Sequence, residues 1–227
     1  MASHMTRYFE LLGVPLRRWS RSRQQSDGID VGSALEACGR VLLLVSDAAI
    51  EPVVADNPAL SEKMLIHFSG SLSTPVAQGM HPLCTFGTEL YDLETYRQVP
   101  FVCERGKYTF EAIFPHLPNP TFTIDAGDKP LYHALAVLAG NFTYVLWTKL
   151  FSDFESRLGL PREAAIPYLR TIASNLSGGR ADALTGPLTR GDSETVAANL
   201  AALQGDPFQD VYRAFVQAIA PDLLRDS

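Results

Sequence analysis

Cysteine is scarce in this sequence, and its few copies lie far apart. The 227 residues include three, Cys38, Cys84 and Cys103. No two of them form the C-x-x-C pair that is typical of zinc sites, and an odd number argues against a framework of disulfide bonds. We therefore expect no metal site, and we expect the protein to reside in a reducing compartment, the cytoplasm.

A basic surface and a long hydrophobic run are lacking as well. The formal net charge is −6, whereas proteins that bind nucleic acid present a basic face to the phosphates. The longest apolar runs, such as residues 41–45, are far shorter than the roughly 20 residues that span a bilayer. We expect neither nucleic acid nor membrane as a partner, and no signal peptide. The opening Met-Ala-Ser-His is typical of a cloning remnant, with Met5 as the intended start.

The first half of the chain alternates helix-like and strand-like segments. Short helices are expected over residues 6–13, where Gly13 ends the pattern, and over residues 33–38. Compact apolar runs bounded by Gly, Pro and Ser predict strands. The alternation predicts an α/β fold with a parallel sheet. The expected strands are residues 14–19, 41–45, 64–68, 99–103 and 121–124.

The second half changes to helical periodicity after residue 125. One apolar stripe recurs at the spacing of a single helix face and predicts an amphipathic helix. Its members are Leu131, Leu135, Leu138, Phe142 and Val145. We therefore place a domain boundary near residue 126, between a mixed domain and an all-helical one.

Hydroxyl and basic side chains follow the first predicted strand. Ser20, Arg21 and Ser22 lie at its carboxyl end, which is the edge where open α/β sheets bind ligands. In a dinucleotide-binding fold this position meets the adenosine ribose, and these donors suit a 2′-phosphate. A solvated basic loop explains the same cluster equally well.

Polar side chains also follow the next two predicted strands. Asp47 either caps the helix that begins there, which we favour, or borders a cofactor together with Ser46 and Ser69. His81 precedes a proline and is therefore in extended backbone. With the hydroxyl of Ser71, it is a candidate for lining a substrate cleft.

The helix that opens the second half carries polar residues beside its apolar stripe. Lys129, His133 and Asn141 lie at i, i+4 and i+12, within an arc of about 120°. A lysine or histidine next to an amide donor can polarise a carbonyl and move a proton during hydride transfer. The alternative is a capped helix start with scattered polar residues.

A turn near the C-terminal end supplies the last candidates. Gly186 and Pro187 predict a tight turn between Thr185 and Arg190, and Asp192 can cap the helix that follows. Arg190 is then placed to bind a carboxylate or a phosphate, or to pair with the capping aspartate.

Together these segments resemble one family, the Rossmann-like proteins that carry the domain of unknown function DUF2520. These are relatives of pyrroline-5-carboxylate reductase, ketopantoate reductase and the β-hydroxyacid dehydrogenases. The resemblance runs from about Thr6 to Ala220 and rests on ordered motifs. They are Trp-Ser-Arg-Ser at 19–22, Ser-Asp-Ala-Ala-Ile at 46–50, Phe-Ser-Gly-Ser-Leu at 68–72, His-Pro-Leu-Cys-Thr-Phe at 81–86, Tyr-His-Ala and Asn-Phe within 132–142, and Leu-Thr-Gly-Pro and Arg-Gly-Asp within 184–192.

The resemblance implies an incomplete Rossmann sheet over residues 6–125. An all-helical domain follows over residues 126–227, similar to the C-terminal domain of 6-phosphogluconate dehydrogenase. It also implies a homodimer through that domain and an NADP-dependent reductase of a small oxo or imino acid, with a ketopantoate reductase-like activity as one candidate. Together with the patterns above, it assigns Lys129, His133 and Asn141 to catalysis; Ser20, Arg21, Ser22, Ser46, Asp47 and Ser69 to the cofactor; and Ser71, His81, Thr185 and Arg190 to the substrate.

The sequence departs from the family at its front. Family members begin with a strand and a glycine-rich loop that cradles the pyrophosphate, and no G-x-G-x-x-G motif occurs here. Residues 6–12 look like the remainder of the helix behind that loop. We therefore expect the first strand to be missing, Met5 to be an internal methionine, and NADPH to bind weakly or not at all. The alternative function is a non-catalytic binding or scaffold protein that retains the fold.

Overall fold

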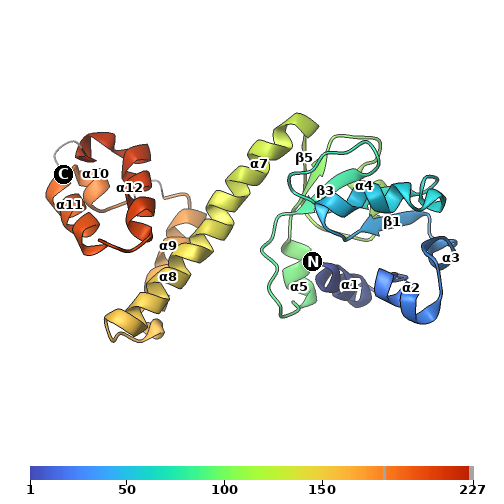
Figure 1. Ribbon diagram of the computed structural model, residues 1–227, viewed down its shortest axis with the longest axis horizontal. Helices are drawn as coiled ribbons and strands as arrows, with labels where there is room; N and C mark the ends of the chain where they lie inside the picture. Colours follow the sequence, from blue (N-terminus) through green and yellow to red (C-terminus); the bar gives the residue numbers. More distant parts are fainter. Residues whose placement is uncertain (181–182, 225–227) are drawn as a thin grey trace. The chain divides into compact units, whose positions relative to one another are not determined.

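The computed structural model describes residues 1–180 and 183–224, without the side chain of Arg23 (Figure 1). By contacts the chain divides into two compact units, Met1–Thr148 and Lys149–Ser227. The change from mixed to all-helical structure comes earlier, at the 3-10 turn η2 (Ala126–Asp128). The two divisions differ because the helix that follows this turn contacts the sheet through side chains such as Lys129, which pairs with Glu104.

Five strands form one sheet in the first unit. The β1–β2, β2–β3 and β4–β5 pairs are parallel and the β3–β4 pair is antiparallel. This mostly parallel sheet confirms the predicted α/β class, with one antiparallel pair as a correction. The pattern does not predict β3, because Gly79 and Pro82 interrupt its apolar run. In sheet order the strands are β1 (Arg40–Leu43), β2 (Met64–His67), β3 (Gln78–Pro82), β4 (Phe101–Glu104) and β5 (Thr121–Ile124).

Residues 14–19, predicted to be a strand, are not one in the structure. The sheet begins at β1, and within the described chain β1 pairs with β2 alone. No neighbouring strand therefore offers hydrogen bonds to residues 14–19, and an extended segment needs such a partner to form a ladder. The prediction was wrong for this segment. Consequently Ser20, Arg21 and Ser22 do not follow a strand, and Arg21 begins the helix α2 (Arg21–Asp27).

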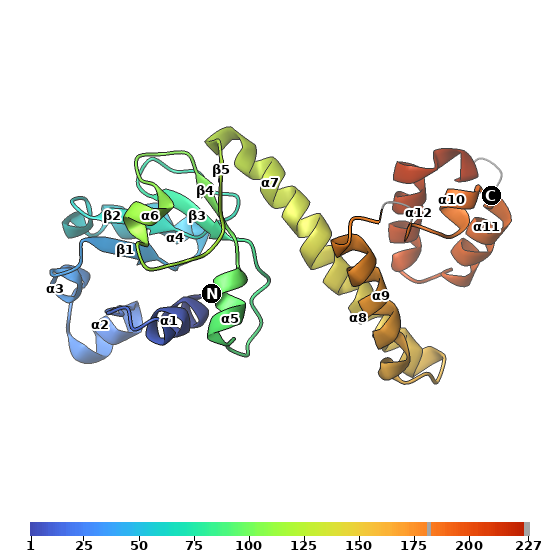
Figure 2. The ribbon, with the colours of Figure 1, turned by 180° about the vertical axis from the view of Figure 1, so that it is seen from behind.

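Helices cover both faces of the sheet. Figure 1 shows α4 (Asp47–Ala55) in front of the strands, and Figure 2, from behind, shows α6 (Phe110–Ile113) in front of them. Two apolar clusters match these faces. The first unites Val41 and Leu43 of β1 with Ile50 and Val53 of α4. The second unites α6 with the core of β2, β3 and β4, and its buried members include Ile66, Phe68, Met80, Phe101, Cys103, Phe110 and Ile113.

The N-terminal helix α1 (Ala2–Leu11) packs into the second cluster through Met5, Tyr8 and Phe9. It confirms the predicted helix and is followed by Gly13, whose φ of +67° suits glycine. The helix also includes three of the four residues interpreted as a cloning remnant. His4 is buried and hydrogen-bonds the Tyr96 hydroxyl at 3.0 Å, so these residues take part in the fold.

The remaining elements of the first unit are short and frame the sheet. Asp30 caps α3 and Asp92 caps α5, each by accepting a hydrogen bond from a backbone N–H three residues on. These caps fix where the connecting loops turn back toward the sheet. The short elements are α3 (Val31–Leu35), η1 (Pro58–Leu60) and α5 (Leu93–Gln98).

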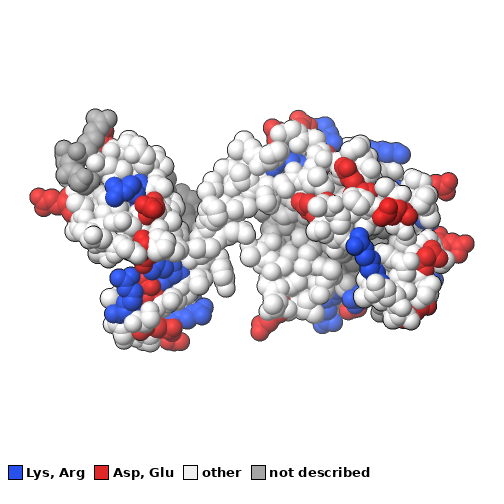
Figure 3. Space-filling model, viewed as in Figure 1, with Lys and Arg blue, Asp and Glu red and all other residues white. Residues whose placement is uncertain are grey.

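A long helical stretch opens the second half as predicted. It comprises α7 (Lys129–Ala136), a π-helical turn η3 (Val137–Asn141) and α8 (Phe142–Arg157). Its apolar stripe, however, does not face a core. Leu131 is 64% exposed and Phe142 is 50% exposed. Residues 130–148 include no Asp, Glu, Lys or Arg, and α7 and η3 form an uncharged surface in Figure 3.

Over Ala126–Arg157 this stretch has 32 residues and a mean hydropathy of 1.3 in its most apolar window, none of which is buried. By length and composition this stretch could therefore cross a membrane, which the short, fully apolar runs of the sequence did not indicate. One such helix is weak evidence, because a helix face that binds another protein passes the same test.

The second unit is helical throughout its described residues and has a small core of its own. Val196, Leu200 and Val216 are buried there. Lys149 and Arg157 of α8 both form ion pairs with Asp153 and Asp206, the shortest being 2.5 Å between Lys149 Nζ and Asp206 Oδ2. The helices after α8 are η4 (Arg162–Ala165), α9 (Ile166–Ser177), α10 (Pro187–Arg190), α11 (Ser193–Ala202), α12 (Phe208–Ile219) and η6 (Pro221–Leu224).

Candidate active site

Three titratable side chains meet where α7 crosses the end of β3. The hydroxyl of Tyr132 and Nδ1 of His81 share a hydrogen bond of 2.6 Å. The rings of His81 and His133 lie edge to face, with centroids 6.3 Å apart. Tyr132, His133 and His81 are each only partly buried, so the cluster is open to a substrate. The structure thus brings together two of the predicted site residues, His81 and His133.

Burial fixes the protonation of this cluster at neutral pH. Burial lowers the pKa of His81 to about 4, assisted by the nearby positive charges of His133 and Lys129. Burial also raises the pKa of Tyr132 to about 12. At pH 7 a neutral imidazole therefore holds a protonated phenol. That pair can present a proton to a neighbouring acceptor.

Glycine at position 70 allows the loop after β2 to approach the same cluster. A Cβ placed on Gly70 would lie 2.5 Å from Cδ2 of His133 and 3.2 Å from Nε2 of His81. Both distances are too short for any other side chain without a shift of the histidines. The bare backbone of Gly70 therefore forms one wall of the site.

Lys129, predicted to be catalytic, anchors α7 to the sheet. Its side chain is 3% exposed, and Nζ forms an ion pair with Oε2 of Glu104 at 3.0 Å. Nζ also donates to the carbonyl of Leu72. Buried charges require such partners, and here they join α7, β4 and the loop after β2. A catalytic role for Lys129 stays a prediction.

His67 lies beside this ion pair in the interior of the sheet. It is fully buried, and its Nε2 has no hydrogen-bond partner among the described residues. Burial lowers its pKa to about 4. His67 is therefore a neutral core histidine at pH 7, and its titration is linked to the stability of the fold.

Asn141, the third predicted catalytic residue, is not brought to this cluster. It lies eight residues beyond His133, about 12 Å further along the helix. It is exposed at the end of the π-helical turn η3. A catalytic role for Asn141 stays a prediction.

Two of the predicted cofactor residues are hydrogen-bonded to each other at the carboxyl ends of β1 and β2. The Ser69 hydroxyl donates to Oδ2 of Asp47 at 2.6 Å and accepts from the N–H of Leu72 at 2.9 Å. The expected cap by Asp47 is wrong, because Ser46 occupies the N-cap position of α4 and the Asp47 carboxylate turns to Ser69. A cofactor role for Asp47 and Ser69 stays a prediction.

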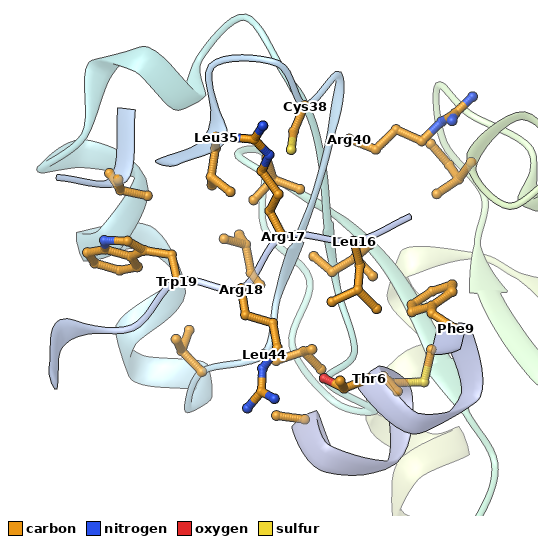
Figure 4. A pocket seen from close by; sticks show the side chains of 18 of the residues that line it. Thr6, Phe9, Leu16, Arg17, Arg18, Trp19, Leu35, Cys38, Arg40 and Leu44 are labelled. Atoms are coloured by element: carbon orange, nitrogen blue, oxygen red, sulfur yellow. The ribbon is translucent and has the colours of Figure 1, made fainter. Parts of the chain in front are cut away.

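The other predicted cofactor residues border a cavity of about 990 Å³ between β1 and residues 14–21 (Figure 4). Ser20, Arg21 and Ser46 line it, and the hydroxyls of Ser20 and Ser22 are 3.0 Å apart. Among the described residues, no Asp or Glu lines this cavity. Its lining contains four arginines, namely Arg17, Arg18, Arg21 and Arg40. This wall is suited to an anion.

The predicted substrate residues fall in both units. Ser71 is exposed in the loop after β2, where its N–H donates to the Ser69 hydroxyl. Thr185 and Arg190 belong to the second unit. Nη2 of Arg190 lies 3.8 Å from Oδ2 of Asp192, and Asp192 caps α11 as predicted. Substrate binding by these residues stays a prediction.

Sequence reasoning missed Tyr132, Glu104 and Gly70. A signal for Tyr132 was available, since residues 129, 132 and 133 share one helix face at i, i+3 and i+4. Glu104 ends a strand that pattern reasoning treated as apolar. Gly70 gave no signal, because its role depends on two histidines from distant segments.

Residues 103–219, just over half of the chain, match the family defined by the domain of unknown function DUF2520. A search of curated proteins found no match.

Solved structures show that the fold is Rossmann-like with a helical region after it. A protein of Bacteroides fragilis assigned as an NADP oxidoreductase is 19% identical, with a TM-score of 0.73 over 97% of this chain and 94% of that chain. A Thermotoga maritima protein is 25% identical, with a TM-score of 0.60 over 82% and 78%. A Streptomyces aurantiacus imine reductase is 14% identical, with a TM-score of 0.62 over 95% and 89%.

Proposed function

The chain belongs to the DUF2520 family, and on that basis we propose that it is an NADP-dependent reductase of a small oxo or imino acid. The observation that carries the proposal is the 2.6 Å hydrogen bond between Tyr132 and His81 beside Gly70. Reduction of a C=O or C=N bond needs a proton at the oxygen or nitrogen when a hydride reaches the carbon. A partly exposed, protonated phenol supplies that proton.

The cofactor proposal rests on the cavity beside β1. A 2′-phosphate needs cationic and hydroxyl donors, and a nearby carboxylate would repel it. The cavity offers Arg17, Arg18, Arg21 and Ser20 and no carboxylate, so these residues fit NADP better than NAD. When bound, NADPH supplies the hydride. Ser46, Asp47 and Ser69 would border it at the carboxyl ends of β1 and β2.

Tyr132 is the proposed proton donor and His81 its positioning residue. The phenol gives its proton to the substrate oxygen or nitrogen as the C–H bond forms, and the phenolate then takes a proton from solvent. His81 orients the phenol through Nδ1 and stays neutral because its pKa is held at about 4. His133, whose ring centroid lies 6.3 Å from that of His81, is the candidate for a hydrogen bond to the acid group of the substrate.

The substrate class has support from the similar structures, one of which is an imine reductase. An oxo acid and an imino acid present the same demands to the site, a planar carbon and a basic atom beside it. Substrate binding by Thr185 and Arg190 stays a prediction from the sequence. Ketopantoate is one oxo acid that fits this description.

We also propose that the protein is a cytoplasmic homodimer whose interface includes the apolar stripe of α7 and α8. Leu131, Leu135 and Phe142 are at least half exposed, and an uncovered face of this kind marks a protein–protein contact. A second copy explains it without a membrane. The alternative function is a non-catalytic scaffold that retains the fold. Such a scaffold would use this interface and would not bind a cofactor.

The test is NADPH oxidation by the full chain against a panel of 2-oxo acids and cyclic imines, compared with Tyr132→Phe. Tyr144→Phe is the matched control, because Tyr144 lies on the same helical stretch and is 71% exposed. We expect turnover in the unmodified chain and in the control, and a large loss in Tyr132→Phe. Equal rates in all three would overturn the assignment of the donor. No NADPH binding at all would favour the scaffold.

A further inference from the structure

One carboxylate, at the end of β4, binds two segments that border the candidate site. Oε2 of Glu104 forms the ion pair with Nζ of Lys129 on α7 at 3.0 Å. Oε1 accepts a hydrogen bond of 2.6 Å from the Ser73 hydroxyl, in the loop that follows β2. The Glu104 side chain is 11% exposed, so little solvent competes for either contact. Glu104 therefore ties α7 and this loop to the same point of the sheet.

Both segments carry groups of the site close to these contacts. Tyr132 follows Lys129 by three residues, about one turn further along α7 on the same helix face. Gly70 precedes Ser73 by three residues, and its bare backbone forms one wall of the site. The position of each group therefore depends on the anchor beside it.

The loop and the helix are also joined directly. Nζ of Lys129 donates to the carbonyl of Leu72, so the helix and the loop share this contact as well as the carboxylate. The N–H of Leu72 in turn donates to the Ser69 hydroxyl at 2.9 Å. Gly70 thus lies between two bonded points of its own loop. With the carboxylate in place, the loop has little freedom to move away from α7.

The register of α7 on β3 explains why this anchor affects the proton donor. Gly79 and His81 lie on one face of β3, because side chains alternate along a strand. A Cβ on Gly79 would lie 2.9 Å from Oε2 of Glu104 and would collide with Lys129, so the ion pair occupies the space beside Gly79. Two residues along the strand, about 6.7 Å, His81 bonds Tyr132, and the matching three residues of helix span about 4.5 Å. The ion pair and the hydrogen bond are therefore successive contacts along one strand face, and a shift of the first moves the second.

We propose that Glu104 is a positioning residue for the proton donor. Its carboxylate holds Lys129 and Ser73 together. This fixes the hydrogen bond between Tyr132 and His81 and the glycine wall beside it. Glu104 acts on the reaction through Tyr132, without contact to the substrate. The effect on the reaction rests on the proposed reductase function, whereas the effect on the hydrogen bond does not.

The first test observes the hydrogen bond itself, by nuclear magnetic resonance of the ring nitrogens of His81 in the full chain. Glu104→Gln keeps the volume and an acceptor oxygen of the side chain but removes the charge that pairs with Lys129. We expect the Nδ1 resonance of His81 to move to the position it has in Tyr132→Phe. The matched control is Asp125→Asn, which removes a carboxylate from an exposed ion pair just after β5 and should leave the resonance in place.

A resonance that stays in place in Glu104→Gln would overturn the proposal, whatever the rates. If this variant does not fold, Ser73→Ala decides the matter, because it removes one contact of the carboxylate and leaves the buried ion pair intact. We expect a smaller movement of the His81 resonance in the same direction, since part of the molecules then lose the hydrogen bond. An unmoved resonance in Ser73→Ala would overturn the proposal in that case.

The second test measures the rate of NADPH oxidation. Glu104→Gln should lower kcat by about tenfold to a hundredfold, as a misplaced reacting group does, with the KM of the substrate and the Kd of NADPH little changed. Added to Tyr132→Phe, it should lower kcat no further, because a residue that acts through the phenol has no effect once the phenol is gone. Additive losses, or an unchanged kcat in Glu104→Gln, would overturn the proposal. No turnover by the unmodified chain would instead contradict the reductase function, and the His81 resonance would still decide the role of Glu104.

Discussion

The two sides of the ligand-binding edge differ in how far their groups are already assembled. Where β3 meets α7, Tyr132 and His81 are hydrogen-bonded, and Lys129 and Glu104 form a buried ion pair. Beside β1, by contrast, a cavity of about 990 Å³ separates the strand from the arginines of residues 17–21. The comparison teaches that side-chain contacts already hold the proton-donating groups in place, whereas the arginine side chains on the other side line an open cavity.

The largest effect should come from the assembled side. Tyr132→Phe removes the proposed proton donor, and such a donor contributes about 10²–10⁴-fold in rate. We expect kcat to fall by that factor in NADPH oxidation assays, with KM little changed. Tyr144→Phe should leave both constants intact. If Tyr132→Phe had the same kcat as the unmodified chain, the cluster of Tyr132, His81 and His133 would be structural and not catalytic.

The ion pair that anchors α7 should have the next largest effect, on stability. Lys129→Met leaves the buried carboxylate of Glu104 without its partner, which costs about 3–5 kcal/mol in comparable buried pairs. Urea unfolding of the variant and of the unmodified chain measures this loss of unfolding free energy. The control is Arg105→Ala, since Arg105 and Asp125 pair at 2.6 Å with side chains 70% and 66% exposed, and such pairs contribute about 1 kcal/mol or less. Similar losses in both variants would contradict the anchoring role.

Acid should weaken the assembled side through its buried histidines. The pKa of His67 is lowered from 6.5 to about 4, so its stabilising effect is fully present above pH 6.5 and is lost as the pH falls toward 4. This amounts to roughly 3 kcal/mol at most. His67→Met should reduce the pH dependence of the unfolding free energy in that window by about half, because His81, whose pKa is also lowered to about 4, keeps its own share. The control His116→Gln changes an exposed histidine and should leave the pH dependence as it was.

The smallest effect should come from the open side. Arg21→Ala removes one charge-assisted contact to a 2′-phosphate, worth about 1.5–3 kcal/mol, and should lower the preference for NADPH over NADH by about tenfold to a hundredfold. Calorimetric titration with both cofactors measures it. Arg7→Ala is the control, because Arg7 is exposed on α1 and does not line the cavity. A loss of affinity for both cofactors alike would assign Arg21 to a different contact.

The same two sides show what the sequence could predict. Runs such as residues 64–68 and 121–124 identified β2 and β5, because apolar strands bounded by turn residues depend on local pattern. The same kind of pattern predicted a strand over residues 14–19, and that prediction was wrong. A strand also requires a neighbouring strand to pair with, and the described chain offers none beside residues 14–19. The helical stripe from Leu131 to Val145 was placed correctly on a helix, yet it is exposed, since periodicity does not say what covers a face.

The candidate site followed the same division. His81 and His133 were identified by their positions on separate elements, and the fold brought them together. Asp47 was assigned to a cap on local grounds, whereas its partner Ser69 comes from another strand. Gly70 depends on two histidines that approach from β3 and α7. Local sequence pattern therefore could not predict those features of the site that depend on contacts between segments distant in the sequence.

The most direct test of the central claim is a calorimetric titration of NADPH and NADH into the unmodified full chain. The arginine-rich, carboxylate-free wall beside β1 predicts that NADPH binds at least about tenfold more tightly than NADH, even where the absolute affinity is weak. Equal affinity for the two cofactors would contradict the account.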